Sequence, residues 1–260
     1  MTYTRISYEI QNEVAVVRLN DPRSLNAVSL AMADELLQAV ERAQRESRAL
    51  LIGCVGSAFC SGANLIAGGI DLDDPQRDLG LVLETYFNPF IMRVRSSKVP
   101  VVTAVRGAAA GVGSSIALCA DIIVAAESAY FYQAFCHVGL VPDAGAAYLL
   151  ARAVGRVRAM ELMLLGGKLP AAKALEWGLI TRVVPDAELD ASALRIAQQL
   201  AQGPRSLGMI REGAWAALDL DLERELGRER EQQCAAGRTA DFAEGLSAFR
   251  EKRAAVFKGT

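Results

Sequence analysis

The feature that most constrains the fold is a passage that occurs twice, in which a short apolar strand runs into a loop of small residues. The strand over 49–55 leads into the loop GSAFCSGANL, and the strand over 99–105 leads into a Gly-rich stretch over 106–115. A helical pattern over 113–119 and another strand over 121–126 follow the second loop. Strands that alternate with helices are typical of crossover units in a largely parallel sheet. The sequence therefore predicts an α/β fold.

The pattern changes on both sides of these passages. Residues 5–10 and 14–19 predict a β-hairpin, and Ser29 is a candidate N-cap for a helix over about 30–45. Further helices are expected over 81–96, 145–154, 156–165, 170–177 and 187–202. The last stretch is charged and amphipathic, without a strand pattern. We therefore expect an α/β core over 1–200 and a helical C-terminal region over 201–260.

Composition and charge disfavour several classes of protein. The 260 residues are 52% hydrophobic with a net charge of −2, so no basic excess favours nucleic acid or an anionic membrane. No apolar run reaches the roughly 18–20 residues of a membrane helix, and the first residues lack a secretory pattern. The five cysteines form no C-x-x-C pair and there is one histidine, which disfavours a disulfide framework and a metal site. We expect a cytoplasmic protein without a bound metal.

The two small-residue loops suggest a binding site made of backbone amides. Small residues let a substrate approach the backbone closely. Two such loops side by side could aim two N–H groups at one carbonyl oxygen. In an oxyanion hole of this kind each donor lowers the activation barrier of the reaction by about 3 kcal/mol. Gly-rich loops are also common as close-packed turns. The spacing alone leaves both interpretations open.

Asp143 is the most informative carboxylate, because it stands between apolar residues and a predicted helix. One interpretation makes it the N-cap of a helix that starts near Ala144, since Asp is a favoured cap. The other makes it a general base in an apolar setting beside Leu140 and Val141, where burial raises its pKa toward the working pH.

Two further groups of residues allow more than one role. His137 lies in the apolar run FCHVGLV and is typical of a packed core or pocket residue, although a triad of Ser115, His137 and Asp143 is also open. Near the C-terminus, basic residues stand beside Phe249. Such a run is usually a solvated helix face, and the alternative is a site for phosphates with an aromatic ring that covers a base.

Five stretches together resemble the enoyl-CoA hydratase/isomerase (crotonase) superfamily in order and spacing over nearly the whole chain. They are SLNAVSLAMADEL (24–36), AFCSGANL (58–65), PVVTAVRGAAAGVGSSIALCADIIVA (100–125), FCHVGLVPDAGAAYLLARAVGRVRAMELMLLG (135–166) and EGLSAFREKRAAVFKG (244–259). The resemblance implies a crotonase (ClpP-like) spiral of β-β-α units with a helical C-terminal trimerisation region, in a homotrimer or a dimer of trimers. It also implies an acyl-CoA thioester as substrate, with no separate cofactor and no nucleic-acid or membrane partner.

The resemblance assigns two groups of binding residues. The thioester oxygen would be held by the backbone N–H groups of Ala63 and Val112, and the β-branched Val112 is expected to narrow the pocket where many members have Gly. The expected contacts to coenzyme A are Asn26, Ala27, Ser61, Gly62, Asn64 and Leu65, together with Phe249 and Lys252 from a neighbouring subunit.

Departures from the family pattern bear on the reaction. The hydratases of the family use two glutamates, and Ser115 and Phe135 stand at the matching positions, so hydration is disfavoured. The isomerases place an acid at the position of Asp143, and AFCHVGLVPDAGAAYLL resembles the ring-epoxide phenylacetyl-CoA isomerase branch. We therefore expect an enoyl-CoA isomerase in which Asp143 moves the proton and Phe135, His137 and Val112 shape a dry acyl pocket.

Other activities remain open at this stage. Ser115 is a further candidate pocket residue, and a hydratase-like or hydrolase-like acyl-CoA enzyme stays possible. A chlorobenzoyl-CoA dehalogenase also has an Asp at this position, paired with a histidine on the preceding helix, and residues 84–96 contain none. Glu84 in that helix is a candidate second acid or a solvent-exposed residue. A catalytically inactive acyl-CoA-binding or RNA-binding homologue is the remaining alternative, and the near-neutral composition disfavours RNA.

Overall fold

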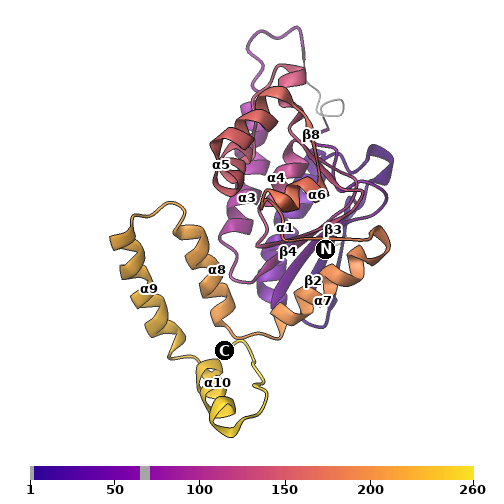
Figure 1. Ribbon diagram of the computed structural model, residues 1–260. Helices are drawn as coiled ribbons and strands as arrows, with labels where there is room; N and C mark the ends of the chain where they lie inside the picture. Colours follow the sequence, from indigo (N-terminus) through magenta and orange to yellow (C-terminus); the bar gives the residue numbers. More distant parts are fainter. Residues whose placement is uncertain (1–2, 65–70) are drawn as a thin grey trace.

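The central element of the computed structural model, which describes residues 3–64 and 71–260, is a six-stranded sheet in the order β1-β2-β3-β4-β6-β9 (Figure 1). Its strands are β1 (Ile6–Gln11), β2 (Val14–Leu19), β3 (Ala49–Cys54), β4 (Val101–Val105), β6 (Ile122–Ala126) and β9 (Arg182–Val184). β1 and β2 form an antiparallel hairpin, and every other neighbouring pair is parallel. The predicted α/β fold, with its N-terminal hairpin, is confirmed.

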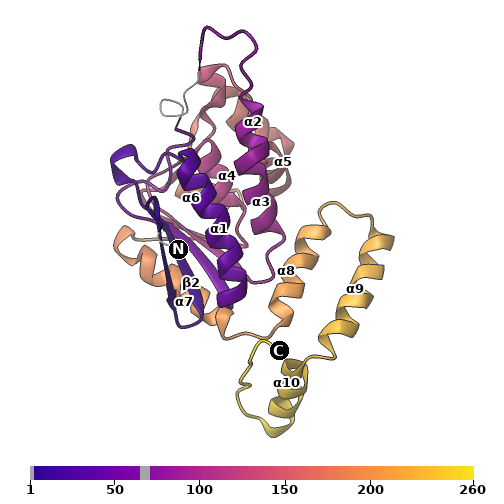
Figure 2. The same ribbon diagram turned by 180° about the vertical axis from the view of Figure 1, so that it is seen from behind.

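Both faces of this sheet are buried, by different helices. Along β2, Ala15 and Val17 pack in a cluster with α1 (Leu30–Glu46) and α3 (Asn88–Arg95). Val14 and Val16 pack on the opposite face with α7 (Leu189–Ala201). Figure 2 shows α1 and α3 on the near side of the sheet. Near-continuous apolar strands are what a sheet covered on both faces requires.

A second sheet of three short strands lies beside the first, in the order β5-β7-β8. Its strands are β5 (Ala108–Ala110), β7 (Tyr130–Tyr132) and β8 (Lys168–Pro170). These strands and β9 are not predicted from the sequence, because three residues are too few to show an alternating pattern. This sheet fixes the Gly-rich stretch after β4 in an extended form.

The remaining helices agree with the sequence pattern, with one structural detail added. They are α2 (Gly80–Val82), α4 (Val112–Leu118), α5 (Ala146–Leu165), α6 (Ala171–Glu176), α8 (Ser206–Ala216), α9 (Leu222–Ala236) and α10 (Ala240–Glu251), with a π-helical segment over Leu83–Phe87 and short 3-10 turns over Pro22–Ser24, Ala134–Val138 and Asp186–Glu188. The predicted helices over 145–154 and 156–165 are one element that breaks at Gly155, which is non-helical. Ser29 caps α1 as predicted, because its Oγ accepts a hydrogen bond from the Met32 N–H.

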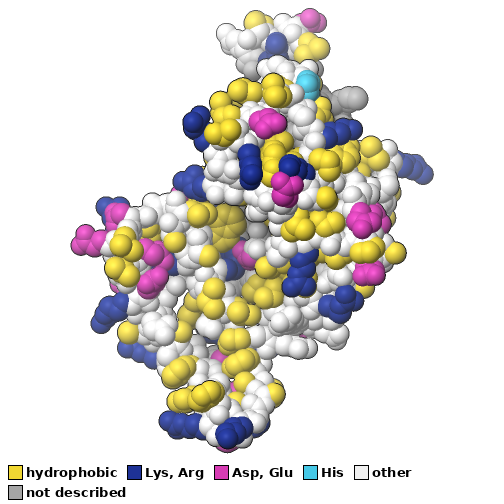
Figure 3. Space-filling view, in the orientation of Figure 1, with side chains coloured by type: hydrophobic (Ala, Val, Ile, Leu, Met, Phe, Trp, Pro, Cys, Tyr) yellow, Lys and Arg dark blue, Asp and Glu magenta, His cyan; other side chains and the backbone are white. Residues whose placement is uncertain are grey.

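Helices α8, α9 and α10 project away from the sheet, as Figures 1 and 2 show from two sides. A buried ion pair anchors α8: Arg211 Nε donates to Asp121 at 2.8 Å, and Trp215 Nε1 donates to the other oxygen of the same carboxylate at 2.9 Å. The projecting part exposes large apolar side chains, among them Leu222 and Phe249 (Figure 3). α7 is thus the last helix on the sheet, and the helices after Ala201 form a separate layer of structure.

Within the described residues, no helix is both long and apolar enough to cross a membrane. The same part of the chain contains no cluster of three or more His, Cys, Asp or Glu side chains that could hold a metal ion.

Two loops are locked together where β3 and β4 end. Cys60 N–H donates to Ala108 at 2.8 Å, and Ala110 N–H donates back to Cys60 at 2.9 Å. Gly113, in the first turn of α4, lies directly on Cys60. A Cβ at Gly113 would come within 2.6 Å of the Cys60 Cβ and 2.7 Å of its carbonyl oxygen. Only glycine lets α4 approach this loop.

We predict that Gly113→Ala lowers the free energy of unfolding by about 1–3 kcal/mol, because the added methyl group overpacks a site bounded by backbone. Urea unfolding measures the effect. The matched control is Gly227→Ala in α9, where a Cβ meets nothing within 4 Å. Alanine there raises stability by about 0.5–1 kcal/mol through its better helix propensity. Equal effects of the two substitutions would contradict the close approach of α4 to Cys60.

Candidate active site

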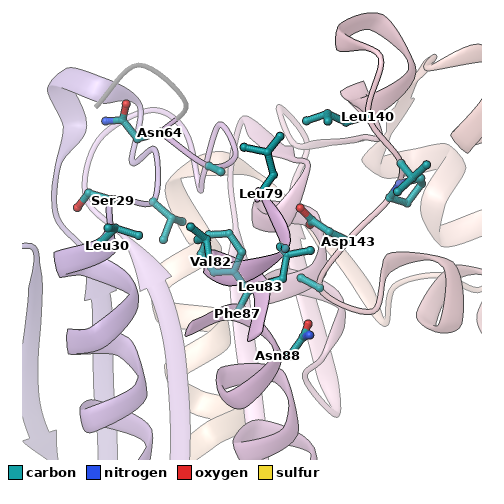
Figure 4. Close-up of a pocket in the computed structure, with 16 residues that line it drawn as sticks. Ser29, Leu30, Asn64, Leu79, Val82, Leu83, Phe87, Asn88, Leu140 and Asp143 are labelled. Atoms are coloured by element: carbon teal, nitrogen blue, oxygen red, sulfur yellow. The ribbon is translucent and has the colours of Figure 1, made fainter. Parts of the chain in front are cut away.

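A cavity of about 460 Å³ lies between the start of α1, the helical segment that begins with α2 at Gly80, and the loop before α5. Figure 4 shows Asp143 on one wall with its carboxyl group turned into the cavity, and Ser29 and Asn64 at the other end. The lining is mainly aliphatic. Its described members are Val28, Ser29, Leu30, Ala63, Asn64, Leu79, Gly80, Val82, Leu83, Phe87, Asn88, Leu140, Val141, Pro142, Asp143 and Ala144.

The backbone after Asp143 explains why its side chain points into the cavity. Ala144 (φ 47°) and Gly145 (φ 77°) are both left-handed, so the chain turns sharply before α5 begins at Ala146. A left-handed conformation at a residue with a Cβ costs on the order of 1–3 kcal/mol and persists only where the surroundings enforce it. Ala144 is buried at 2% exposure, so packing supplies that constraint.

The interpretation of Asp143 as an N-cap is wrong. The N-cap position of α5 is Gly145, and no side chain caps the helix. The Ala146 N–H bonds at 2.9 Å to the backbone carbonyl of Asp143 rather than to its carboxylate. The two left-handed residues separate the carboxyl group from the helix N-terminus, which leaves it available to a ligand.

The environment of Asp143 favours the protonated acid more than water does. Its Oδ1 is buried and has no hydrogen-bond partner. Burial raises the pKa of Asp143 to about 6. A carboxyl group with a pKa near neutrality can both accept and return a proton. Asp143 is also the one carboxylate in the described lining of the cavity.

Two backbone amides on the locked loops are open. Gly62 O accepts from Val28 N–H at 2.8 Å and Asn64 N–H donates to Val28 O at 3.0 Å, so the Ala63 N–H between them faces the other way. Val112 is the first residue of α4, where an amide has no intrahelical partner. Neither amide donates to a backbone carbonyl among the described residues.

The residues before these amides lie in contact, which brings the two loops together. A Cβ built on Gly111 would lie 3.8 Å from the Gly62 Cα. Gly111 has φ 51° and ψ −127°, a conformation that residues with a side chain avoid. The predicted pair of adjacent loops is therefore present. The side chain of Val112 is 2% exposed in the hydrophobic core and does not line the cavity, so the expectation that it narrows the pocket is wrong.

The other four predicted pocket residues are absent from the described lining. Phe135 is buried, with its ring 3.7 Å from where a Cβ on Gly111 would stand. Ser115 is fully buried in α4, and its Oγ donates to the Asp143 backbone carbonyl at 3.3 Å. Glu84 is solvent-exposed. These three residues thus surround the site without facing the cavity.

The Ser-His-Asp triad is wrong, because its members do not meet. His137 is exposed, and its Nε2 lies 3.1 Å from the carbonyl oxygen of Gly166. Ser115 contacts the backbone of Asp143 rather than an imidazole. His137 therefore belongs to the contact between the segment before Asp143 and the end of α5, and its place as a pocket residue is not supported.

The predicted contacts to coenzyme A fall into separate groups. Asn26 is fully buried, and its amide bonds to Asp21 N–H and to the carbonyls of Val55 and Ala58, so its side chain holds the loop together and is not free for a ligand. Ser61 is exposed, with its Oγ bonded to Ser24 O.

The remaining contacts are spread over the chain. Ala27 is half-buried beside Val28, Gly62 and Asn64 adjoin the open amide of Ala63, and Leu65 lies outside the described residues. Phe249 and Lys252 are exposed at the end of α10, far from the cavity in this chain (Figure 1). Contact between these two residues and the cavity requires a second copy of the chain.

Much of the apolar wall comes from residues 79–88, a stretch in which the sequence shows no motif. Val82 and Leu83 line the cavity from a segment in which the helix widens into a π-helix over Leu83–Phe87. Of the aromatic residues in this region, Phe87 lines the cavity and Phe90 is core. π-Helical turns often mark functional sites, but they leave no period that can be read from one sequence.

Comparison with known proteins identifies relatives over the whole chain. Residues 9–260 match the family model for enoyl-CoA hydratase/isomerase. The 1,2-epoxyphenylacetyl-CoA isomerase of Escherichia coli K12 is 40% identical over 253 residues, 96% of this chain and 97% of that protein. A Rhodobacter capsulatus protein named as a probable enoyl-CoA hydratase is 40% identical over all of both chains. The crystal structure of an enoyl-CoA hydratase from Bacillus anthracis superimposes with a TM-score of 0.93 at 29% identity, covering 99% of this chain and 100% of that one.

We predict that Asp143→Asn stabilises the protein at neutral pH and not at low pH. The folded-state pKa of about 6 lies above the ordinary 3.8, so the native state binds the proton more tightly than the unfolded chain. The cost of ionising Asp143 is absent below pH 3.8, grows between pH 3.8 and 6, and is complete above pH 6. With allowance for partial solvent exposure, asparagine should gain about 1–2 kcal/mol at pH 7.5 and almost nothing at pH 4. Urea unfolding at the two pH values measures it, and a gain independent of pH would contradict the burial of the charge.

Proposed function

The chain belongs to the enoyl-CoA hydratase/isomerase family, with the crotonase fold, and we propose that it is an acyl-CoA isomerase that moves a double bond from the 3- to the 2-position of an enoyl-CoA. The observation that carries the proposal is Asp143, the one carboxylate in the described lining of an apolar cavity. Its Oδ1 is buried with no partner among the described residues, and its pKa is raised to about 6. One acid/base group suffices for a reaction that neither gains nor loses a proton.

The proposed mechanism uses the open amides and the carboxylate in sequence. The N–H groups of Ala63 and Val112 hold the thioester oxygen, and ionised Asp143 removes a proton from C2. The electrons of that C–H bond become the enolate, whose negative oxygen the two amides stabilise, each by about 3 kcal/mol. The enolate reforms the carbonyl as C4 takes the proton back from Asp143, which leaves the double bond between C2 and C3. The aliphatic wall keeps water from the carbanion.

The same residues argue against hydration. Adding water to a 2-enoyl-CoA needs a group that activates the water and a group that protonates the α-carbon, which is the work of the two glutamates in the hydratases. In this chain Ser115 and Phe135 stand at those positions, and neither ionises as an acid. Both side chains are buried. A relative named as an isomerase and one named as a probable hydratase are both 40% identical to this chain, so sequence identity does not distinguish the two reactions. The choice between isomerisation and hydration rests on which carboxylates line the cavity.

The isomerase from Escherichia coli gives a second candidate reaction at the same site. Its name specifies a 1,2-epoxyphenylacetyl-CoA, and it is 40% identical over almost the whole length of both chains. A ring-bearing acyl group would lie against the same aliphatic wall, with its thioester oxygen at the same two amides. Assay of a 3-enoyl-CoA beside an epoxidised aryl-acetyl-CoA distinguishes the two substrates.

We also propose that the active protein is a homotrimer or a dimer of trimers built on α8–α10. The exposed apolar side chains of this region (Figure 3) provide a surface for another copy. In such an assembly Phe249 and Lys252 of a neighbouring copy reach the coenzyme A moiety, whose thioester end approaches the turn at Ala63. Equilibrium sedimentation of the whole chain measures the number of copies.

We predict that Asp143→Asn reduces kcat for isomerisation of a 3-enoyl-CoA by about 10³-fold or more, because the amide cannot take up the proton. Formation of the conjugated 2-enoyl-CoA is followed by ultraviolet absorbance, with hydration of a 2-enoyl-CoA assayed beside it. Wild type should isomerise the 3-enoyl-CoA readily and should hydrate the 2-enoyl-CoA only poorly. Glu84→Gln is the matched control, since it neutralises an exposed carboxylate outside the described lining, and it should keep the wild-type rate. Rapid hydration by wild type, or a full rate in Asp143→Asn, would contradict the proposal.

A further inference from the structure

The short helix α4 carries one of the open amides and a hydroxyl that contacts the loop of Asp143, although neither side chain lines the cavity. Its first residue, Val112, has one of the two open amides. One turn later Ser115, fully buried, donates its hydroxyl hydrogen to the backbone carbonyl of Asp143 at 3.3 Å. Only one helical turn separates the two residues. Helix α4 therefore holds both the amide of Val112 and, through Ser115, the backbone of Asp143.

The carbonyl that Ser115 holds lies at the most constrained point of the loop. It accepts a second hydrogen bond from Ala146 N–H at 2.9 Å, at the start of α5. Between these two donors the chain passes through the left-handed residues Ala144 and Gly145. A strained turn keeps its shape only where it is held from outside. The hydroxyl of Ser115 is a side-chain contact from a different element that holds this turn.

We propose that Ser115 is a positioning residue, which fixes the carboxyl group of Asp143 relative to the Val112 amide by holding the Asp143 carbonyl. The residue that replaces a hydratase glutamate thus has a role of its own in this chain, through the backbone of the base rather than through substrate. The inference rests on the proposed function, because it assumes that Asp143 moves the proton.

The chain offers a matched control on the same helix. Ser114 is also fully buried, and its hydroxyl accepts a hydrogen bond from Gln133 Nε2 at 3.0 Å. Ser114→Ala and Ser115→Ala each remove one buried hydroxyl from the same turn of α4. They differ in which group loses its partner: a glutamine side chain in the first, the backbone of Asp143 in the second.

The test is a comparison of steady-state kinetics on a 3-enoyl-CoA for the whole protein and its variants. Ser115→Ala should lower kcat by about 10- to 100-fold, the cost of displacing a reacting group by up to 1 Å, with KM changed by less than about threefold. Ser114→Ala should keep kcat within about threefold of wild type. In an Asp143→Asn background, Ser115→Ala should change the residual rate by less than about twofold, because the two residues act as one unit.

Each other outcome has a definite meaning. If Asp143→Asn is inactive and Ser115→Ala matches Ser114→Ala, the positioning role is wrong and the proposed function stands. If Ser115→Ala causes the same loss with and without Asp143, its effect is general damage to the fold and the positioning role is again wrong. A full rate in Asp143→Asn overturns the proposed function and this inference together. Should Ser115→Ala fail to fold, Ser115→Cys keeps nearly the same volume with a weaker donor, and its kcat and KM are judged by the same criteria.

Discussion

The site depends on one constraint, which is that a carboxyl group lines an apolar cavity while its Oδ1 has no hydrogen-bond partner among the described residues. Water or a helix N-terminus would satisfy the oxygens of Asp143 and hold its pKa low. The left-handed pair at Ala144 and Gly145 removes it from the N-terminus of α5, and its Oδ1 is buried beside the aliphatic wall. Burial then raises the pKa to about 6. The same burial lowers the stability of the protein when Asp143 ionises, and it brings the pKa into the range that the proposed base needs at neutral pH.

The rest of the fold holds this group against the two open amides. The parallel strands β3 and β4 end side by side, so the loops that follow them meet at one edge of the sheet. Close contact of Gly113 with Cys60 locks α4 onto the first loop. α4 in turn bonds to the loop of Asp143 through Ser115. A continuous set of contacts thus joins the amides of Ala63 and Val112 to Asp143, and the proposed reaction through an enolate needs that fixed relation.

Much of this architecture could be predicted from the sequence. Long helices and strands show a periodic spacing of apolar residues, and the two loops are recognised by their enrichment in small residues. The hairpin, α1 with its Ser29 cap, the core strands and the helical C-terminal region are of this kind. The three-residue strands of the second sheet and the π-helical turn over Leu83–Phe87 leave no such signal. Of the two interpretations of Asp143 that the sequence leaves open, the N-cap is wrong, because the rule that Asp caps helices assumes ordinary backbone on its C-terminal side and Ala144 is left-handed. The partners of His137 and Ser115 are far along the chain, at Gly166 and Asp143, so only the folded structure pairs them.

The central claim, that one carboxylate in a dry cavity carries the proton from C2 to C4, is tested most directly by isotope transfer. A 3-enoyl-CoA that carries deuterium at C2 is converted in ordinary water, and the conjugated product is analysed for label at C4 by mass spectrometry and NMR after a single turnover. The account predicts that a substantial share of the transferred deuterium appears at C4 of the same molecule, because Asp143 keeps it away from solvent. A product with only solvent hydrogen at C4 would contradict the account, since it would require a second acid or a base open to water.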